Sequence, residues 1–419
     1  MKIDKAAETI KKGDKAVFLS NFFKKNIIKR FNSIEKGSVI LLDNTEKYSF
    51  GELHCNKSLE VRVLSPNFYV LLGSGGLMGA AEAYTLGYWK CNDLVALITL
   101  LFENKKVMDK MDSGFALMFK PINSFIHWLN RNSLKGSKKN IIAHYDLSNE
   151  FYQLWLDETM TYSCGFFKNK NTTMKEASIE KLDRLCRKLD LRKDDSILEI
   201  GTGWGSFAIY AAKKYGCNIT TTTISDAQYE LAKKRICEAK LEDKITLIKQ
   251  DYRNLDGKFD KIISIEMIEA VGHEYVPTYL RKVSSLLKDD GLFAMQGITY
   301  NDQGFDSYKT SVDFIKKYIF PGSCLISISQ ITDVMKKQTD LSLSHLEDIT
   351  LHYASTLKEW RKKFLSEVDS IKKLGFSKEF MNMWEFYLVY CEAGFRLRNI
   401  GDYQFLFAKS GSKNIKIEY

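Results

Sequence analysis

The sequence contains little that interrupts regular structure. Only four of its 419 residues are proline, and it has no long tract rich in serine, glycine or glutamine. Because disordered segments are enriched in such residues, we expect ordered structure outside the first few residues and about the last ten. Apolar residues make up 45% of the chain and aromatic residues 13%, which is enough to fill the cores of two domains.

Metal-binding and disulfide patterns are also missing. The eight cysteines are scattered, form no CxxC pair and have no histidine partners at metal-ligand spacing. The sequence therefore predicts neither a metal site nor a disulfide framework. We interpret most of the cysteines as small buried apolar residues.

Long apolar runs are absent as well. The longest nearly uninterrupted run, residues 94–102, is about half of the ~20 residues that a membrane-spanning helix needs. The N-terminus has no apolar signal core, so we expect a cytoplasmic protein. The 62 Lys and Arg against 52 Asp and Glu give a net charge of +10, which favours an anionic partner, either nucleic acid or an acidic membrane surface.

An amphipathic segment lies near the N-terminus. Apolar residues recur at helical spacing over residues 18–31, with basic residues between them. Such a helix can lie on a lipid surface, although a helix packed on its own domain has the same period and is more common. Short strands at residues 38–42 and 59–63, followed by helical sequence over 79–102, predict mixed α and β structure here.

Two further segments precede the second half of the chain. The glycine-rich residues 73–79 lack a following Gly-Lys-Ser/Thr, so we interpret them as a helix entry rather than a phosphate cradle. The basic and aromatic residues 115–139 are interpreted as a hinge or surface segment.

From residue 196 onward, strand-like and helix-like segments alternate. These segments are residues 196–200, 207–215, 218–222, 227–239, 245–250, 261–265, 275–287 and 292–298. Such alternation predicts a parallel, doubly wound sheet with helices on both faces.

A glycine-rich turn follows the first of these strands. In the string Leu198-Glu199-Ile200-Gly201-Thr202-Gly203-Trp204-Gly205, the glycines permit a tight turn and close approach of the backbone to a nucleotide-like ligand. Dinucleotide-binding folds use a similar GxGxxG. The GxGxG spacing with Glu199 before it resembles the first motif of class I S-adenosylmethionine methyltransferases.

Other residues expected to bind the nucleoside follow the next two strands. No acidic residue ends the strand at 218–222, so Thr223, Ser225 and Gln228 are expected to bond the ribose hydroxyls instead. Asp251 can accept from the adenine amino group, and Tyr252 can cover the ring. A helix cap and a packed aromatic residue are the alternative interpretations of these two.

Several strings in a particular order resemble the cyclopropane-fatty-acid synthase family, which includes the mycolic acid cyclopropane synthases. They begin at His144 (HYDLSN), Thr161 (TYSC), Leu198 (LEIGTGWG), Thr223 (TISDAQ), Asp251 (DYR), Glu266 (EMIEAVG), Lys317 (KYIFPG) and Cys391 (CEAGFR). The resemblance covers about residues 70–409.

This resemblance implies an α/β fold with two domains. A Rossmann-like class I methyltransferase domain would occupy residues 126–419, after a smaller α+β lipid-engaging domain at 1–125.

The resemblance also implies an activity. The cofactor would be S-adenosylmethionine, and its methyl group would pass to the cis double bond of unsaturated phospholipid acyl chains, forming a cyclopropane. The expected partner is then an anionic phospholipid membrane, with which the protein would associate peripherally, and not nucleic acid. The formation of a homodimer is possible. Tyr162 and Ser163, together with His144 to Asp146, are implied to close over the cofactor.

The resemblance also implies a bicarbonate ion as the base that takes a proton from the added methyl group. Cys164, Glu269, Ile298 and Tyr353 would hold it, Cys164 and Ile298 largely through their backbone groups. Gln296 stands where the better-known bacterial members have histidine, and it can form hydrogen bonds but cannot carry a proton. The alternatives are that Cys164 is only a buried thiol and that Glu269 pairs with a Lys or Arg.

Three other functions remain open. A methyltransferase of the same fold could add a methyl branch without closing a ring, or could methylate a small amine, because coclaurine-type N-methyltransferases share much of the later pattern. The third is a membrane-binding protein without catalysis. The intact glycine turn and Glu269 argue against the third, since a scaffold needs no cofactor loop.

Overall fold

The computed structural model describes residues 13–44, 46–52, 58–107, 147–413 and 415, with the side chains of 13–18 excepted. The chain divides into two units, Met1–Phe125 with Val368–Leu397, and Ile126–Glu367 with Arg398–Tyr419. The sequence analysis assigned all of 126–419 to one domain, whereas 368–397 groups with the N-terminal elements. The segment 115–139 and His144 to Asp146 lie outside the described residues.

The first unit contains a small mixed sheet and five described helices. The described strands lie in the order β2-β1-β3-β4, with β1 and β3 parallel and the other pairs antiparallel. The elements are α2 (Gly13–Phe31), β1 (Ser38–Asp43), β2 (Glu46–Gly51), β3 (Leu59–Val63), α3 (Asn67–Thr85), β4 (Trp89–Cys91), α4 (Leu94–Glu103), α16 (Val368–Lys373) and α17 (Lys378–Arg396).

Helix α2 packs on its own unit through one face. Phe23, Ile27 and Phe31 are buried, and a Cβ placed on Gly73 of α3 would meet the Phe23 ring at 2.1 Å. Phe22, in contrast, is 45% exposed. The glycine-rich residues 73–79 lie where two helical segments of α3 meet at a kink, with φ +58° at Gly76, so the second of these segments is entered within them, as the sequence predicts.

Helix α17 is distant in sequence from the elements it packs against. It contacts α3 and α4, and the Tyr390 ring lies 5.4 Å from that of Phe102. The Tyr84 hydroxyl donates to the Glu385 carboxylate at 3.0 Å. These contacts place α17 in the core of the first unit.

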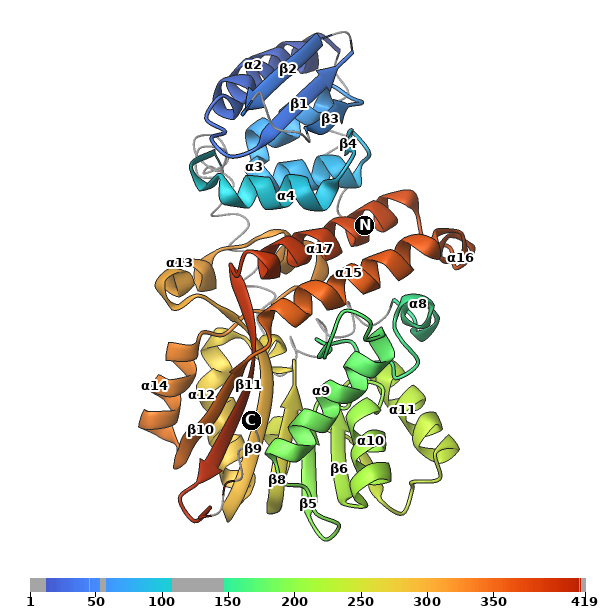
Figure 1. Cartoon of the computed structure of the whole chain (residues 1–419), viewed down its shortest axis with the longest axis vertical. Helices are drawn as coiled ribbons and strands as arrows, with labels where there is room; N and C mark the ends of the chain where they lie inside the picture. Colours follow the sequence, from blue (N-terminus) through green and yellow to red (C-terminus); the bar gives the residue numbers. More distant parts are fainter. Residues whose placement is uncertain (1–12, 45, 53–57, 108–146, 414, 416–419) are drawn as a thin grey trace. The chain divides into compact units, whose positions relative to one another are not determined.

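The second unit is built on one large sheet (Figure 1). Its described strands lie in the order β10-β11-β9-β8-β5-β6-β7. Those from β9 to β7 are parallel, while β11 runs antiparallel to β9 and β10. The strands are β5 (Ser196–Ile200), β6 (Asn218–Thr223), β7 (Ile245–Lys249), β8 (Phe259–Ile265), β9 (Leu287–Tyr300), β10 (Leu341–Asp348) and β11 (Ile400–Lys409).

The helices of this unit fill the connections between strands. They are α8 (Asn149–Trp155), α9 (Met174–Lys188), α10 (Ser206–Tyr215), α11 (Asp226–Glu238), α12 (Val276–Leu286), α13 (Phe305–Thr310), α14 (Ile328–Gln338) and α15 (Thr350–Ser366). Five short helical turns join them, η1 (Tyr252–Asn254), η2 (Ile268–Ala270), η3 (His273–Tyr275), η4 (Asp302–Gly304) and η5 (Ile315–Ile319). The predicted alternation of strands and helices over 196–298 is confirmed, with shifts of a few residues at the ends.

Apolar residues cover both faces of the sheet because successive strand residues point to opposite sides. Ile197 packs in a cluster with residues of α9 and α10, whereas its neighbour Leu198 packs with residues of α12 and α14. The sheet is therefore doubly wound, as the sequence predicts.

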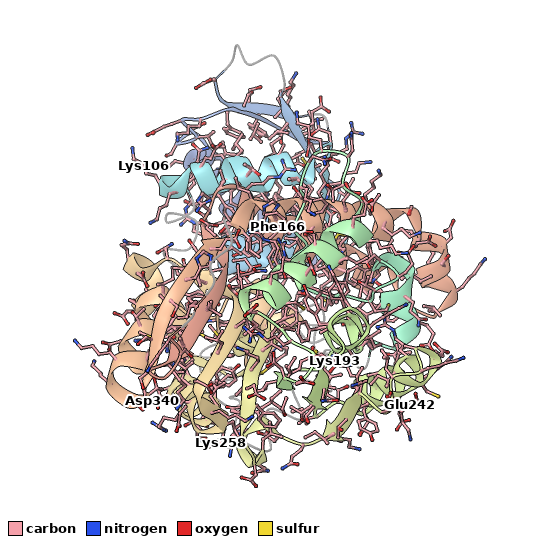
Figure 2. The ribbon with its side chains drawn as sticks, turned by 60° about the horizontal axis from the view of Figure 1, so that its bottom comes forward. Lys106, Phe166, Lys193, Glu242, Lys258 and Asp340 are labelled. Atoms are coloured by element: carbon pink, nitrogen blue, oxygen red, sulfur yellow. The ribbon has the colours of Figure 1, made fainter. Side chains whose placement is uncertain are left out.

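The two ends of the parallel strands differ in character. Lys193, Glu242 and Lys258 are exposed in the loops that lead into β5, β7 and β8 (Figure 2). At the opposite, carboxyl ends, the chain turns back through glycines, threonines and buried acids. Ligands bind at these carboxyl ends in open α/β sheets.

None of the helices in the described ranges combines the length and the apolar character required to cross a bilayer.

Candidate functional site

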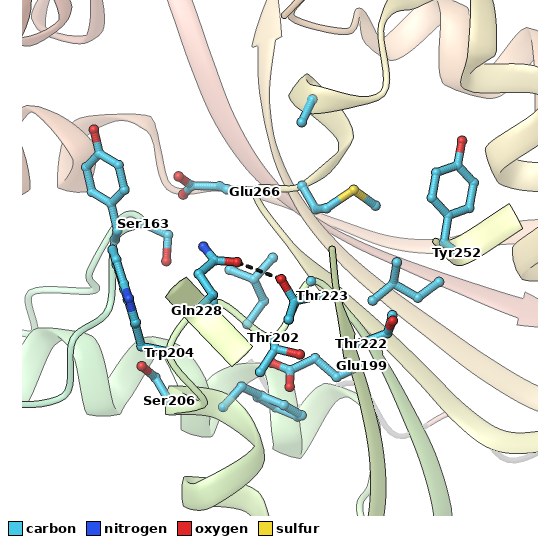
Figure 3. Close-up of a pocket in the computed structure, with 18 of the residues that line it drawn as sticks. Ser163, Glu199, Thr202, Trp204, Ser206, Thr222, Thr223, Gln228, Tyr252 and Glu266 are labelled. Atoms are coloured by element: carbon cyan, nitrogen blue, oxygen red, sulfur yellow. Dashed lines mark hydrogen bonds between the residues drawn. The ribbon is translucent and has the colours of Figure 1, made fainter. Parts of the chain in front are cut away.

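A cavity of about 180 Å³ opens at the carboxyl ends of the parallel strands (Figure 3). Residues that end or follow β5, β6 and β8 line it, among them Gly201, Thr223 and Glu266. In Figure 3, Tyr252 lies on the opposite side of this cavity from Ser163 and Trp204. Mainly apolar surface with a few polar side chains, such as that of Asp251, is a lining that a nucleoside ligand can use.

The glycine turn forms one wall of the cavity. Gly201 has φ +102° and Gly203 has φ +53°, a region that favours glycine. A Cβ on Gly203 would meet no atom within 4 Å, so it would project into the space that a ligand needs. Gly205 is not on the cavity wall. It precedes α10 with φ +86°, so its role is in the turn rather than in direct binding.

Most of the other residues expected to bind the cofactor line the cavity. They are Tyr162, Ser163, Thr223, Gln228, Asp251 and Tyr252. The Thr223 hydroxyl donates to the Gln228 side chain at 2.8 Å (Figure 3). Ser225 is an exception, because its hydroxyl caps α11 by accepting from the Gln228 N–H at 3.2 Å. Its expected bond to the ribose is not supported by this position.

Asp251 combines both interpretations offered by the sequence. It lines the cavity, and it also caps η1 and holds the Arg253 guanidinium, with an Oδ2 to Nη2 distance of 2.6 Å. Burial opposes ionisation, but the bonds to Arg253 hold the pKa of Asp251 below its usual range. An ionised Asp251 remains an acceptor for an amino group.

Glu199 is a buried acid beneath the glycine turn. It accepts from the Thr221 hydroxyl at 2.5 Å and lies on the cavity wall. Burial raises its pKa to about 8. These features fit S-adenosylmethionine, which supplies an electrophilic methyl group on a sulfonium when bound.

A second acid, Glu266, lies where the cavity meets the residues expected to hold bicarbonate. Its Oε1 accepts from the Cys164 N–H at 2.8 Å and the Gln296 amide at 2.7 Å. Its Oε2 accepts from the Tyr353 hydroxyl at 2.6 Å. Burial raises the pKa of Glu266, while the charge of Lys181 and these hydrogen bonds lower it.

Glu269 lies beyond Glu266. Its Oε1 accepts from the Ile298 N–H at 2.5 Å, and its Oε2 has no hydrogen-bond partner among the described residues. Burial, with a smaller contribution from the charge of Glu266, raises the pKa of Glu269 to about 8. Glu269 is therefore a neutral acid at pH 7. The alternative interpretation, in which Glu269 forms an ion pair with Lys or Arg, finds no such pair in the described part of the chain.

The bicarbonate implied by the family resemblance does not fit this arrangement. The Cys164 N–H, the Tyr353 hydroxyl and the Gln296 amide donate to Glu266, and the Ile298 N–H donates to Glu269. Each expected donor is thus already paired with a carboxyl group of the chain. A separate anion would have to displace these groups and lie beside a buried carboxylate, which like-charge repulsion opposes.

Strand β11 contributes two polar residues that the sequence analysis missed. The Gln296 amide also donates to Asp402 at 3.2 Å, and its carbonyl accepts from Gln404 at 3.0 Å. Both β11 residues are fully buried. Burial and the charges of Glu266 and Glu269 raise the pKa of Asp402 well above its ordinary value.

Lys181 of α9 is another residue that the sequence analysis missed. It is fully buried on the cavity wall, and its Nζ donates to the Ser163 hydroxyl at 2.6 Å. Burial lowers its pKa, while the charges of Glu266 and Asp402 act in the opposite direction. Ala177, Lys181 and Leu185 share one helical stripe, and a lysine within an apolar stripe is the signal that could have revealed it.

Aromatic side chains surround Tyr162. Its ring lies 5.5 Å from that of Trp155 and 5.3 Å from that of Trp360. Trp360 lies in turn 6.2 Å from Tyr353 in an edge-on arrangement. Ring faces can stabilise a positive charge within such a site. Cys164 is fully buried, which agrees with the alternative interpretation that its side chain is only a buried thiol.

Comparison with known proteins gives three concordant findings. The family model described as mycolic acid cyclopropane synthetase matches residues 132–405. The tuberculostearic acid methyltransferase of Mycobacterium tuberculosis is 35% identical over 349 residues, covering 81% of each chain. The cyclopropane-fatty-acyl-phospholipid synthase of Escherichia coli K12 is 31% identical over 362 residues, covering 85% of this chain and 90% of that protein.

A solved structure supports the same assignment. The mycolic acid cyclopropane synthase CmaA1, complexed with SAH and CTAB, has a TM-score of 0.61 and 28% identity, covering 65% of this chain and 98% of that one. Together with the glycine turn and the cavity above it, these matches show that the chain belongs to the mycolic acid cyclopropane synthetase family and is an S-adenosylmethionine-dependent lipid methyltransferase.

Proposed function

We propose that the enzyme adds a methyl group to the cis double bond of an unsaturated phospholipid acyl chain and then closes a cyclopropane ring. The observation that carries this proposal is the electrostatic character of the site. Asp402 and Lys181 are fully buried, and Glu266 and Glu269 are partly buried beside them. The Glu266 carboxylate, which its hydrogen-bond donors hold in this low-dielectric site, favours a positive charge that develops on the substrate.

The reaction requires this character. A double bond has no proton to lose before it attacks the methyl group, so no base is needed for the first step. Transfer leaves a carbocation, which the acidic and aromatic groups can stabilise. Ring closure then requires a group that takes a proton from the added methyl. The similarity to the phospholipid synthase of E. coli supports this choice of product and substrate.

The second candidate product is an acyl chain that gains a methyl branch without ring closure and, after loss of a proton from the carbocation, keeps a double bond. Its support comes from a relative named as a tuberculostearic acid methyltransferase, which is 35% identical over 81% of this chain. The two products diverge only after methyl transfer, so they share the first half of the reaction and the same cofactor site.

One assay separates the candidates. Purified enzyme is incubated with S-adenosylmethionine labelled in the methyl group and with vesicles of an unsaturated phospholipid. We expect labelled acyl chains that have gained CH₂ and show upfield ring proton signals. Labelled chains without ring signals would select methyl branching, and the absence of label from every lipid would refute both proposals.

We further propose that an anionic phospholipid membrane is the surface on which the enzyme works and that the enzyme associates with it peripherally. The net charge of +10 supports attraction to such a surface. The exposed Leu19 and Phe22 of α2, which lie beside the exposed Lys25, provide apolar groups for insertion.

A further inference from the structure

We propose that Glu266 is the base that takes the proton from the added methyl group, so that this enzyme carries as a side chain the carboxylate that the family resemblance assigns to a bound bicarbonate. The inference rests on the proposed function. It concerns which group performs the proton transfer.

The position of Glu266 is the first argument. It directly follows β8 and lines the cofactor cavity together with Gly201 and Met267. In Figure 3 its carboxyl group lies on the same side of the cavity as Ser163, across from Tyr252. Glu266 thus lies away from Tyr252, the residue that is expected to cover the adenine ring.

The backbone of Glu266 provides the second argument. Its φ is +47°, a left-handed conformation that costs a residue with a side chain roughly 1–2 kcal/mol. Its N–H is fixed by the Gln296 carbonyl at 2.8 Å. Strained residues of this kind persist where the surrounding structure holds them, and they cluster at active sites. Glycine would adopt this conformation without cost, but it would bring no carboxylate.

The hydrogen bonds of Glu266 are the third argument. Donors from three separate elements converge on it: the Cys164 N–H, the Gln296 amide of β9 and the Tyr353 hydroxyl of α15. These donors orient the carboxylate and stabilise its ionised form. Burial raises its pKa at the same time, which makes the ionised group a stronger base.

The chemical step balances with Glu266 alone. After methyl transfer, a C–H bond of the new methyl group breaks and its electron pair forms the third bond of the ring at the cationic carbon. The proton passes to the Glu266 carboxylate, which becomes a carboxylic acid and later releases the proton to water. No oxidant, reductant or additional anion is required.

The experiment compares two substitutions, each assayed with and without added bicarbonate. Glu266→Gly removes the carboxylate, relieves the backbone strain and frees the three donors. We expect it to lose about 10²- to 10⁴-fold in activity in buffer stripped of bicarbonate, and to recover a large part of it when bicarbonate or formate is added. Glu266→Gln fills the same space without a base, so it should lose similar activity and show no recovery.

The controls separate a chemical role from a structural one. Both variants should bind S-adenosylhomocysteine with the affinity of the unsubstituted enzyme, because the glycine turn is untouched. The exposed Glu274→Gln should keep full activity. The unsubstituted enzyme should be indifferent to bicarbonate.

Two outcomes would overturn the inference. In the first, the activity of the unsubstituted enzyme falls when bicarbonate is removed and recovers when it is restored. In the second, Glu266→Gln keeps near-full activity. If the unsubstituted enzyme transfers no label to lipid under any condition, the proposed function itself is refuted.

Discussion

At the scale of single residues, the position relative to the cavity separates the glycine that is expected to contact a ligand from the one that only turns the chain. Gly203 combines φ +53° with open space where a Cβ would project, whereas Gly205 has positive φ but lies off the cavity wall. Sequence spacing cannot make this distinction, because both glycines belong to the same motif.

Gly203→Leu should abolish cofactor binding while the protein stays folded. The side chain would fill the cavity, and the left-handed backbone would cost roughly 1–2 kcal/mol of stability. Calorimetric titration with S-adenosylmethionine should show an affinity lower by at least about 100-fold. Gly375→Leu is the matched control, since Gly375 has φ +89° and open space around it but does not line the cavity. Unchanged affinity in Gly203→Leu would refute the assignment of this turn.

Glu269 should make the protein less stable as pH rises. Its pKa is about 8 in the folded protein and near 4.5 when exposed, so between these values the folded state binds a proton that the unfolded state lacks. Its contribution to stability is present below pH 4.5 and is lost as pH rises towards 8. In Glu269→Gln this loss should disappear.

Urea denaturation at about pH 5.5 and about pH 7.5 measures this effect. The unsubstituted protein should lose up to roughly 2–3 kcal/mol more of its free energy of unfolding over that interval than Glu269→Gln does. Parallel pH dependence in the two proteins would mean that Glu269 is not protonated in the folded state.

The candidate site could be predicted from the sequence only in part, and the reason is physical. Cys164, Gln296 and Tyr353 were identified and do converge, but on Glu266 rather than on an anion. Glu266 directly follows a strand, and that position argues for it more strongly than for Glu269. Asp402 and Lys181 reach the site from β11 and α9, and long-range packing of this kind leaves no local pattern.

At the scale of elements, one residue assigned to the ligand belongs instead to a helix end. Ser225 caps α11 and lies off the cavity wall. Ser225→Ala should therefore lower the free energy of unfolding by about 1 kcal/mol and leave the affinity for S-adenosylmethionine unchanged. Thermal unfolding and titration on the same sample test both parts. A large loss of affinity without loss of stability would restore Ser225 as a ligand.

The strands and helices over 196–298 could be predicted because the strands are apolar or, in β6, rich in β-branched threonine, and short helical segments separate them. The antiparallel β10 and β11 could not, because nothing local shows that the chain returns to the sheet after α14 and again after α17. The grouping of α17 with α3 and α4 is likewise invisible in the sequence. The apolar face of α17 predicts a helix that packs on a core, but it does not indicate which elements α17 packs against.

At the scale of the whole molecule, charge and exposed apolar groups should act together at a membrane. We expect binding to anionic vesicles that weakens as salt is added, with each interfacial Lys or Arg contributing about 1 kcal/mol. Phe22→Ser should weaken binding further at every salt concentration. Vesicle flotation measures both effects, with Leu374→Ser as a control at another exposed apolar position in the same unit. Equal binding to neutral and anionic vesicles at all salt concentrations would contradict the proposal.

The place of β11 in the sheet has a consequence for biosynthesis. β11 pairs with both β9 and β10 and brings Asp402 and Gln404 to the buried site, yet it follows every other described strand in the chain. At ~5–20 residues per second, translation of the chain takes on the order of 20 to 80 seconds. From the completion of β9 at Tyr300 to that of β11 at Lys409, about a quarter of that time, this edge of β9 has no native partner and can pair with another chain. A nascent polypeptide of this kind is a substrate for chaperones on the ribosome until its final strand emerges.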